Sequence, residues 1–195
     1  MRNWAAKRGI DGIHYVSKMS AHEVGIVRSL VSSLVELLDE REGSAPHDEL
    51  AELTGLRTGH SDAPSDGPLQ RLLPDFYRPD EAGDDGVSRE FAGDLNAALR
   101  SLNEPEIIDA KRSAAQTVLA TLPEHAGKVS LTEEQAADWL TAVNDVRLAL
   151  GSLLDITADH PEGRPGIDPA RIDMYHWLSA LLDVLVTAML ERAGD

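Results

Sequence analysis

Residues Ser130 to Asp155, SLTEEQAADWLTAVNDVRLALGSLLD, form the stretch around which the rest of the chain is organised. Thr132 can cap a helix N-terminus, and Gln135 follows at the three-residue spacing of a capping box. Apolar side chains then recur at steps of four and three residues, at Trp139, Val143, Val146, Leu150 and Leu153. This spacing predicts an amphipathic helix of about six turns, whose apolar stripe must be buried against other elements.

Three further long helices are expected. One, near residues 20–41, opens on a second capping box, in which Ser20 precedes Glu23 by three residues. The others are expected near 88–122, with Ser88 as a cap and a continuation or restart at Pro105, and near 169–192, with Asp168 as a cap. The polar positions of this last helix form one narrow stripe, so we expect the rest of its surface to be buried.

Short strands are expected near residues 3–8, 13–17 and 128–131. Gly9 and Gly12 bracket a turn typical of a β-hairpin, and Gly127 opens the third strand. An isolated hairpin is marginal in water, and a lone strand leaves backbone groups unpaired. The predicted fold class is therefore mostly α: a bundle of about four long helices with a small N-terminal hairpin, extended to a three-stranded sheet.

A single domain over residues 1–195 is the expectation for a chain of this length. Three acidic stretches containing Gly or Pro, at about 42–67, 80–87 and 156–168, are expected to be flexible loops. Between the first two lies the apolar segment 69–79, LQRLLPDFYRP. Its large side chains are candidate anchors for a protein partner, namely Leu72, Leu73, Phe76 and Tyr77. The alternative is that this segment folds onto the helices as core.

The charge of the chain limits its partners. It has 34 acidic and 18 basic residues and a net charge of −16. Such a surface repels nucleic acids and anionic membranes, and only a small basic patch around Lys7, Arg8 and Lys18 favours direct DNA binding. We find no signal peptide pattern and no continuous apolar run of about 18 residues, so the expected location is the cytoplasm, without a membrane partner.

Motifs that would indicate catalysis are missing from the sequence. There is no cysteine, so thiol nucleophiles and disulfides are excluded. The seven histidines form neither HxxxH nor HExxH, and neither a GxSxG elbow nor a Gly-rich phosphate loop occurs. We therefore predict no enzyme, no catalytic residues, no cofactor and no metal. The alternative is an enzyme whose site is assembled from scattered loop residues that spacing cannot reveal.

Several segments, in this order, resemble the actinobacterial AosR-like family, formerly a family of unknown function. They include RLLPDFYRPD at 71–80, AADWLTAVNDVRLALG at 136–151 and MYHWLSALLDVLV at 174–186. The resemblance implies an oxidative-stress-linked regulator of gene expression that works with the transcription machinery. A thiol-based redox sensor does not carry over, because this chain has no cysteine.

We therefore expect a cytoplasmic regulatory protein that acts through protein–protein contacts. The negative field would attract a basic partner, such as a component of the transcription machinery. A homodimer built by the apolar last helix is also open, and with it the alternative of a structural or dimeric interaction protein.

Overall fold

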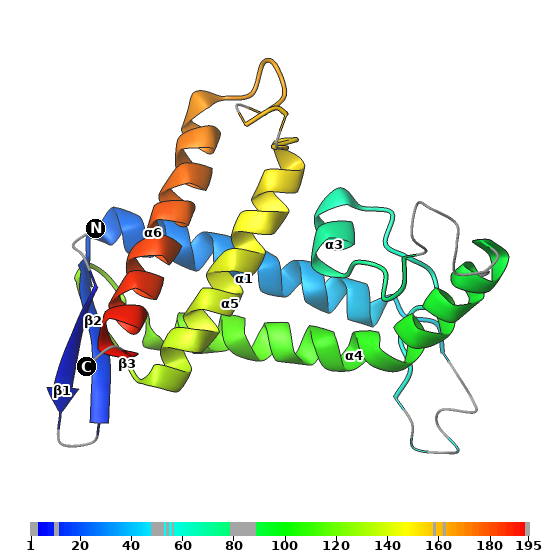
Figure 1. The fold of residues 1–195 in the computed structure, drawn as a ribbon, viewed down its shortest axis with the longest axis horizontal. Coiled ribbons are helices and arrows are strands. Elements are labelled where there is room, and N and C mark those ends of the chain that lie inside the picture. The colour runs from blue at the N-terminus through cyan, green and yellow to red at the C-terminus, as the bar shows by residue number, and fades with distance from the viewer. Residues whose placement is uncertain are drawn as a thin grey trace.

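The computed structural model describes residues 4–9, 12–47, 53, 55, 57–78, 89–157, 159–161 and 163–193. Within these residues the chain forms four long helices, one short helix and three strands, drawn in Figure 1. The order is β1 (Ala5–Gly9), β2 (Gly12–Met19), α1 (Ala21–Gly43), α3 (Gly67–Leu72), α4 (Arg89–Thr121), β3 (Gly127–Leu131), α5 (Glu133–Leu153) and α6 (Pro169–Ala193). The predicted fold class, mostly α with a small N-terminal sheet, is confirmed.

Both predicted capping boxes are present, which explains where α1 and α5 begin. At α1, the Glu23 backbone N–H donates to Ser20 Oγ at 3.3 Å, and the Ser20 N–H donates to the Glu23 carboxylate at 2.8 Å. Thr132 and Gln135 make the same reciprocal pair at α5, at 3.2 and 3.0 Å. Each box satisfies backbone donors that the first helical turn would otherwise leave unpaired.

The three strands form one antiparallel sheet in the order β1-β2-β3. β2 is central, and Tyr15 lies opposite Leu131 across the β2–β3 pair. The predicted joining of residues 127–131 to the N-terminal hairpin is therefore confirmed. β2 and β3 each lead directly into a helix that opens with a capping box, α1 after β2 and α5 after β3.

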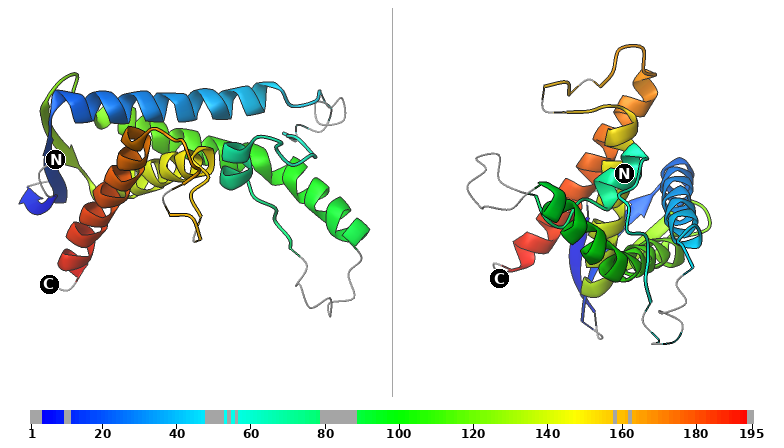
Figure 2. Two further views of the ribbon diagram at one scale, coloured as in Figure 1. Left: turned by 90° about the horizontal axis from the view of Figure 1, so that it is seen from above. Right: turned by 90° about the vertical axis from the view of Figure 1, so that its right-hand side faces the viewer.

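α5 is the centre of the core. It packs against α4, α3 and α6, and more lightly against α1 and the sheet. Trp139, Val143 and Val146 of its apolar stripe are buried, whereas Leu153 at its end is 60% exposed. The Trp139 indole N–H donates to Thr121 Oγ1 at 2.8 Å, so this large buried ring leaves no polar atom unpaired. Figures 1 and 2 show α1 and α4 running alongside each other while the α5–α6 pair crosses them.

α4 continues through Pro105 as one helix. Proline has no N–H, so the carbonyl of Ser101, one turn earlier, receives no helical hydrogen bond from it. The Gly59 backbone N–H donates to that carbonyl at 2.8 Å. A Cβ on Gly59 would lie 3.1 Å from the Pro105 ring, which is tighter than an ordinary van der Waals contact, so this close approach favours glycine. The irregularity in α4 thus becomes the attachment point of the segment around residue 59.

Part of the stretch predicted as the first loop lies against the helices. The Arg41 guanidinium donates to the Asp62 carbonyl at 2.7 Å, and His60 Nε2 lies 2.8 Å from the Arg41 carbonyl oxygen. Residues 48–52, 54, 56, 80–87, 158 and 162 of the predicted loops lie outside the described residues, as does Ser88, the predicted cap of α4.

The expectation that α6 is buried outside its polar stripe is wrong. The stripe itself is exposed as predicted, at Asp173, His176 and Asp183. However, only 22% of the most apolar 18-residue window of α6 is buried, because the helix packs mainly on α5 and has few contacts with the sheet. α6 is long and apolar enough to cross a membrane. Core helices of soluble proteins are often equally long and apolar.

Candidate protein-interaction surfaces

The segment predicted to bind a partner starts as α3 and is partly core. The Asp66 side chain caps α3 by accepting from the Leu69 N–H at 3.0 Å. Leu72 and Leu73 are each only 3% exposed and belong to the hydrophobic core, next to α5. Two of the four candidate anchors therefore hold the segment to the protein and do not face outward.

A buried ionic cluster fixes the rest of this segment. Arg100 of α4 is 1% exposed and donates to the Leu73 carbonyl at 3.0 Å and to Asp75 at 2.9 Å. Its charge is balanced inside by Glu104, at 3.2 Å. Glu104 also accepts two hydrogen bonds from Arg41 of α1, at 2.7 and 3.2 Å. Since buried charges must be paired, this cluster ties α1, α4 and the segment together.

Phe76 and Tyr77 are the more accessible candidate anchors. Phe76 is 40% exposed, and its ring lies 5.9 Å from the Arg100 guanidinium carbon, a cation–π arrangement that holds the ring in place. The Asn96 side chain bonds both backbone groups of Tyr77, at 2.8 and 2.7 Å. Of the four predicted residues, Phe76 presents its side chain to solvent on a firmly held backbone.

A second surface, which sequence reasoning did not single out, is a groove between α1 and α6. A cavity of about 710 Å³ is lined by Ile26 of α1 and by Met174 and Trp177 of α6, all half-buried. A neighbouring cavity of about 370 Å³ shares Ile26 and Met174. Asp173, which is exposed, lies on the rim of the larger one. We call these two cavities together the α1–α6 groove.

The sequence contained one signal for this groove. The polar stripe of α6 is narrow, so its apolar arc is wider than one packing partner can cover. The positions that remain uncovered depend on how α5 and the sheet meet α6, which the sequence of α6 does not encode. The exposed apolar residues of α6 include Val186, 37% exposed, and Leu190, 66% exposed.

Other charged residues form ion-pair networks between the elements. Glu42, Arg57, Asp109 and Arg112 link α1, residue 57 and α4 by ion pairs. The Arg57 guanidinium lowers the pKa of the exposed Asp109 carboxyl. Among the residues that the structure describes, no three His, Asp or Glu side chains are grouped so as to hold a metal ion.

Comparison with known proteins agrees with the resemblance found in the motifs. A family model described as a domain of unknown function, DUF2017, matches residues 1–189. Proteins named oxidative stress regulator AosR from Mycobacterium tuberculosis and Mycobacterium bovis are each 46% identical over 193 residues, which is 97% of this chain and 88% of each relative. A Mycobacterium leprae protein, named putative oxidative stress regulator AosR, is 47% identical over 97% of this chain and 89% of its own length. No solved structure matches the chain. The chain therefore belongs to the DUF2017 family and is a relative of the mycobacterial AosR proteins.

Proposed function

We propose that this chain is a cytoplasmic, stress-linked regulatory protein that acts by binding a basic protein partner, a component of the transcription machinery. The names of its relatives support the link to oxidative stress. Its net charge of −16 supports a basic partner, because the field of the protein would speed encounter with positive surfaces and repel nucleic acids.

The observation that carries a binding role is the uncovered apolar surface of α6. An apolar groove rimmed by carboxylates fits a partner segment that presents aliphatic side chains flanked by Lys or Arg. In the α1–α6 groove, Ile26, Met174 and Trp177 supply the apolar wall and Asp173 the charge. Phe76, with the half-buried Tyr77 beside it, offers a smaller second contact.

Oxidation cannot control this binding through a thiol of this chain, because the chain contains no cysteine. We infer that the chain binds its partner as a constitutive module, and that any response to oxidants resides in the partner or in the amount of the complex. This proposal separates the regulatory role from the sensing step.

The test is capture of the tagged protein from its own cells, followed by binding measurements with the purified basic partner. We expect a basic transcription component to bind the wild type and to dissociate as the ionic strength rises above the physiological value of about 0.15 M. Met174→Glu should weaken that binding by at least about tenfold, since it puts a charge into the apolar groove. Phe76→Ala measures the contribution of the second surface.

Leu190→Glu is the matched control, because it adds the same charge to an exposed part of α6 outside the groove. Equal binding by wild type and Met174→Glu would refute the groove as the contact surface. If the tagged protein captures only copies of itself and no transcription component, the regulatory proposal is refuted.

A second candidate role, a structural homodimer, has one observation in its favour. Val186 and Leu190 are exposed four residues apart on α6, so they lie next to each other on one face of the helix. Sedimentation of wild type and Leu190→Glu distinguishes this role: a dimer that depends on this face becomes monomeric in the variant, while partner binding through the groove persists.

A further inference from the structure

We propose that a cavity between α3, α5 and α6 is a binding site for a small organic oxyanion, a carboxylate or phosphate group carried on a short apolar body. The cavity holds about 420 Å³, within the roughly 300–1,000 Å³ typical of small-molecule sites. This site is separate from the α1–α6 groove and does not depend on the proposed regulatory role.

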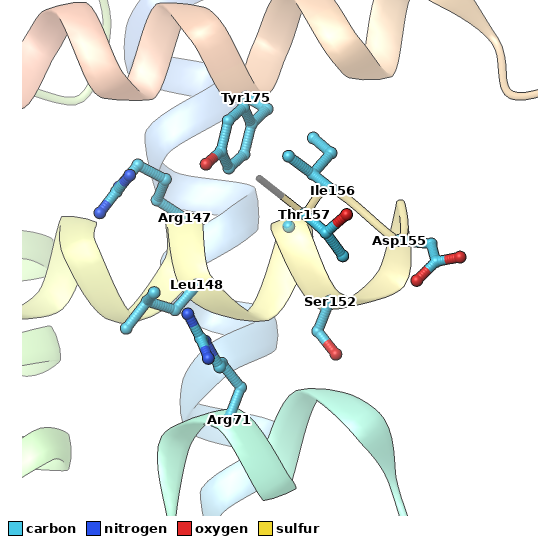
Figure 3. A pocket seen from close by; sticks show the side chains of 9 residues that line it. Arg71, Arg147, Leu148, Ser152, Asp155, Ile156, Thr157 and Tyr175 are labelled. Atoms are coloured by element: carbon cyan, nitrogen blue, oxygen red, sulfur yellow. The ribbon is translucent and has the colours of Figure 1, made fainter. Parts of the chain in front are cut away.

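Two guanidinium groups line the cavity. Arg71 belongs to α3 and Arg147 to α5. The chain has 34 acids and 18 bases, yet this cavity is lined by two arginines and by a single carboxylate, that of Asp155. Figure 3 shows Arg147 on the α6 side of α5, and Arg71 and Leu148 on its α3 side, while the carboxylate of Asp155 points away at the opposite end of the view.

Neither arginine is neutralised within the described part of the chain. Five other cations form ion pairs there, namely Arg41, Arg57, Arg100, Lys111 and Arg112. Arg71 and Arg147 have no such pair among the described residues. An oxyanion bound in the cavity would supply the counter-charge that the two guanidiniums lack among the described residues.

The Arg147 side chain is already held in position. Its Nη2 donates to Asn144 Oδ1 at 2.7 Å, and its guanidinium carbon lies 5.9 Å from the centre of the Tyr175 ring. Tyr175 can approach α5 because residue 151 is glycine: a Cβ there would lie 3.1 Å from Tyr175 Cε2. A planar guanidinium fixed before binding loses little freedom when it forms a two-point contact with an oxyanion.

The remaining lining defines the rest of the ligand. Leu148, Ile156 and the ring of Tyr175 form apolar walls, and Ser152 and Thr157 add hydroxyl groups (Figure 3). Apolar walls favour a ligand with an aliphatic or aromatic body over a free inorganic ion. The hydroxyls can donate to further oxygens or polar substituents of the ligand.

Titration calorimetry with defined probes tests the site. Phenyl phosphate and benzoate provide the two oxyanions on one apolar body, inorganic phosphate lacks the body, and benzamide is the neutral isostere of benzoate. We expect phenyl phosphate or benzoate to bind more tightly than inorganic phosphate, and benzamide not to bind at about 10 mM. Whichever of phenyl phosphate and benzoate binds more tightly identifies the head group of the ligand as a phosphate or a carboxylate.

Arg71→Gln should weaken the binding by about tenfold or more, and Arg147→Gln should do the same. Arg71 is exposed, so its substitution leaves folding intact even if the variant at Arg147 is unstable. Arg8→Gln is the matched control, because Arg8 is an exposed arginine of β1 that does not line the cavity. Failure of every oxyanion probe to bind, equal binding of benzamide and benzoate, or unchanged affinity in Arg71→Gln would each overturn the proposal.

Discussion

Glu104 is a single carboxylate that serves two buried arginines. Its side chain is 2% exposed, as is that of Arg100, and the Arg41 side chain is 10% exposed. Charges this deep in a protein are tolerated because they are paired, and removal of one partner leaves the others uncompensated. The cost of breaking the cluster should therefore be far larger than the cost of breaking a surface pair.

Glu104→Gln should lower the free energy of unfolding by about 3–5 kcal/mol, because Arg41 and Arg100 lose their shared buried counter-charge and Arg100 keeps only Asp75, whose side chain is 46% exposed. The control is Asp39→Asn, which breaks the ion pair between Asp39 and Arg112. The Asp39 side chain is 55% exposed, so this substitution should cost at most about 1 kcal/mol. Urea unfolding followed by tryptophan fluorescence measures both. Similar losses in the two variants would show that burial does not set the cost.

Asp145 offers a test of pH dependence. Burial raises the pKa of its carboxyl group, and the hydrogen bond from Lys111 Nζ, at 2.8 Å, opposes that shift. A folded-state pKa above the unfolded value means that the folded protein holds the proton more tightly. The resulting stability is present below the unfolded pKa and is lost as the pH rises through the folded pKa.

Asp145→Asn cannot titrate, so the free energy of unfolding of wild type minus that of the variant should rise as the pH falls from about 7 to about 4. Urea unfolding of both proteins across this range measures the difference. The exposed Asp173→Asn serves as the comparison. A difference that falls with decreasing pH would mean that Lys111 outweighs burial.

At the scale of elements, the contact between Gly59 and Pro105 predicts non-additive substitutions. Gly59→Ala should cost about 1–3 kcal/mol, because its Cβ would press on the proline ring at 3.1 Å. In a Pro105→Ala background the ring is gone, so the same substitution should cost at least about 0.5 kcal/mol less. A double-mutant cycle by urea unfolding provides the measurement, and strictly additive costs would argue against this contact.

Sequence reasoning succeeded for elements whose signals are local. The capping residues Ser20 and Thr132 with their partners three residues on located α1 and α5, because the hydrogen bonds involved lie within one helical turn. The short helix α3 was not predicted, and its cap Asp66 and first residue Gly67 lie within the stretch 42–67 that was predicted as a loop. Pro74 lies just after its end, where a proline cannot continue the helix.

The candidate sites could be predicted only in part, because they depend on contacts between distant residues. By residue type, Leu72 and Leu73 are as apolar as Phe76. Only the structure distinguishes them, because Leu72 and Leu73 are buried and Arg100 binds the Leu73 carbonyl, whereas Phe76 is exposed. Arg71 and Arg147 are 76 positions apart in the sequence and meet only because α3 and α5 pack together. No local pattern carries that information.

At the scale of the whole molecule, surplus negative charge should govern the response to salt. With 34 acids and 18 bases, repulsion spread over the surface outweighs the exposed ion pairs, each of which contributes little. Raising NaCl from about 0.02 to about 0.2 M should therefore raise the urea midpoint, since screening weakens the repulsion. A lower midpoint at high salt would show that ion-pair networks such as that of Arg112 dominate.

The central position of β2 in the sheet has a consequence for how the chain is made. Tyr15 pairs with Leu131, so the ribosome must add 116 further residues before the partner strand exists. At roughly 5–20 residues per second, that interval is about 6–23 s, much longer than the microseconds in which a hairpin forms. During it the β1–β2 hairpin carries an open edge, which neighbouring nascent chains on the same messenger could pair with. The strand order therefore predicts that this edge is protected during synthesis, either by a chaperone or by α1 folding over it.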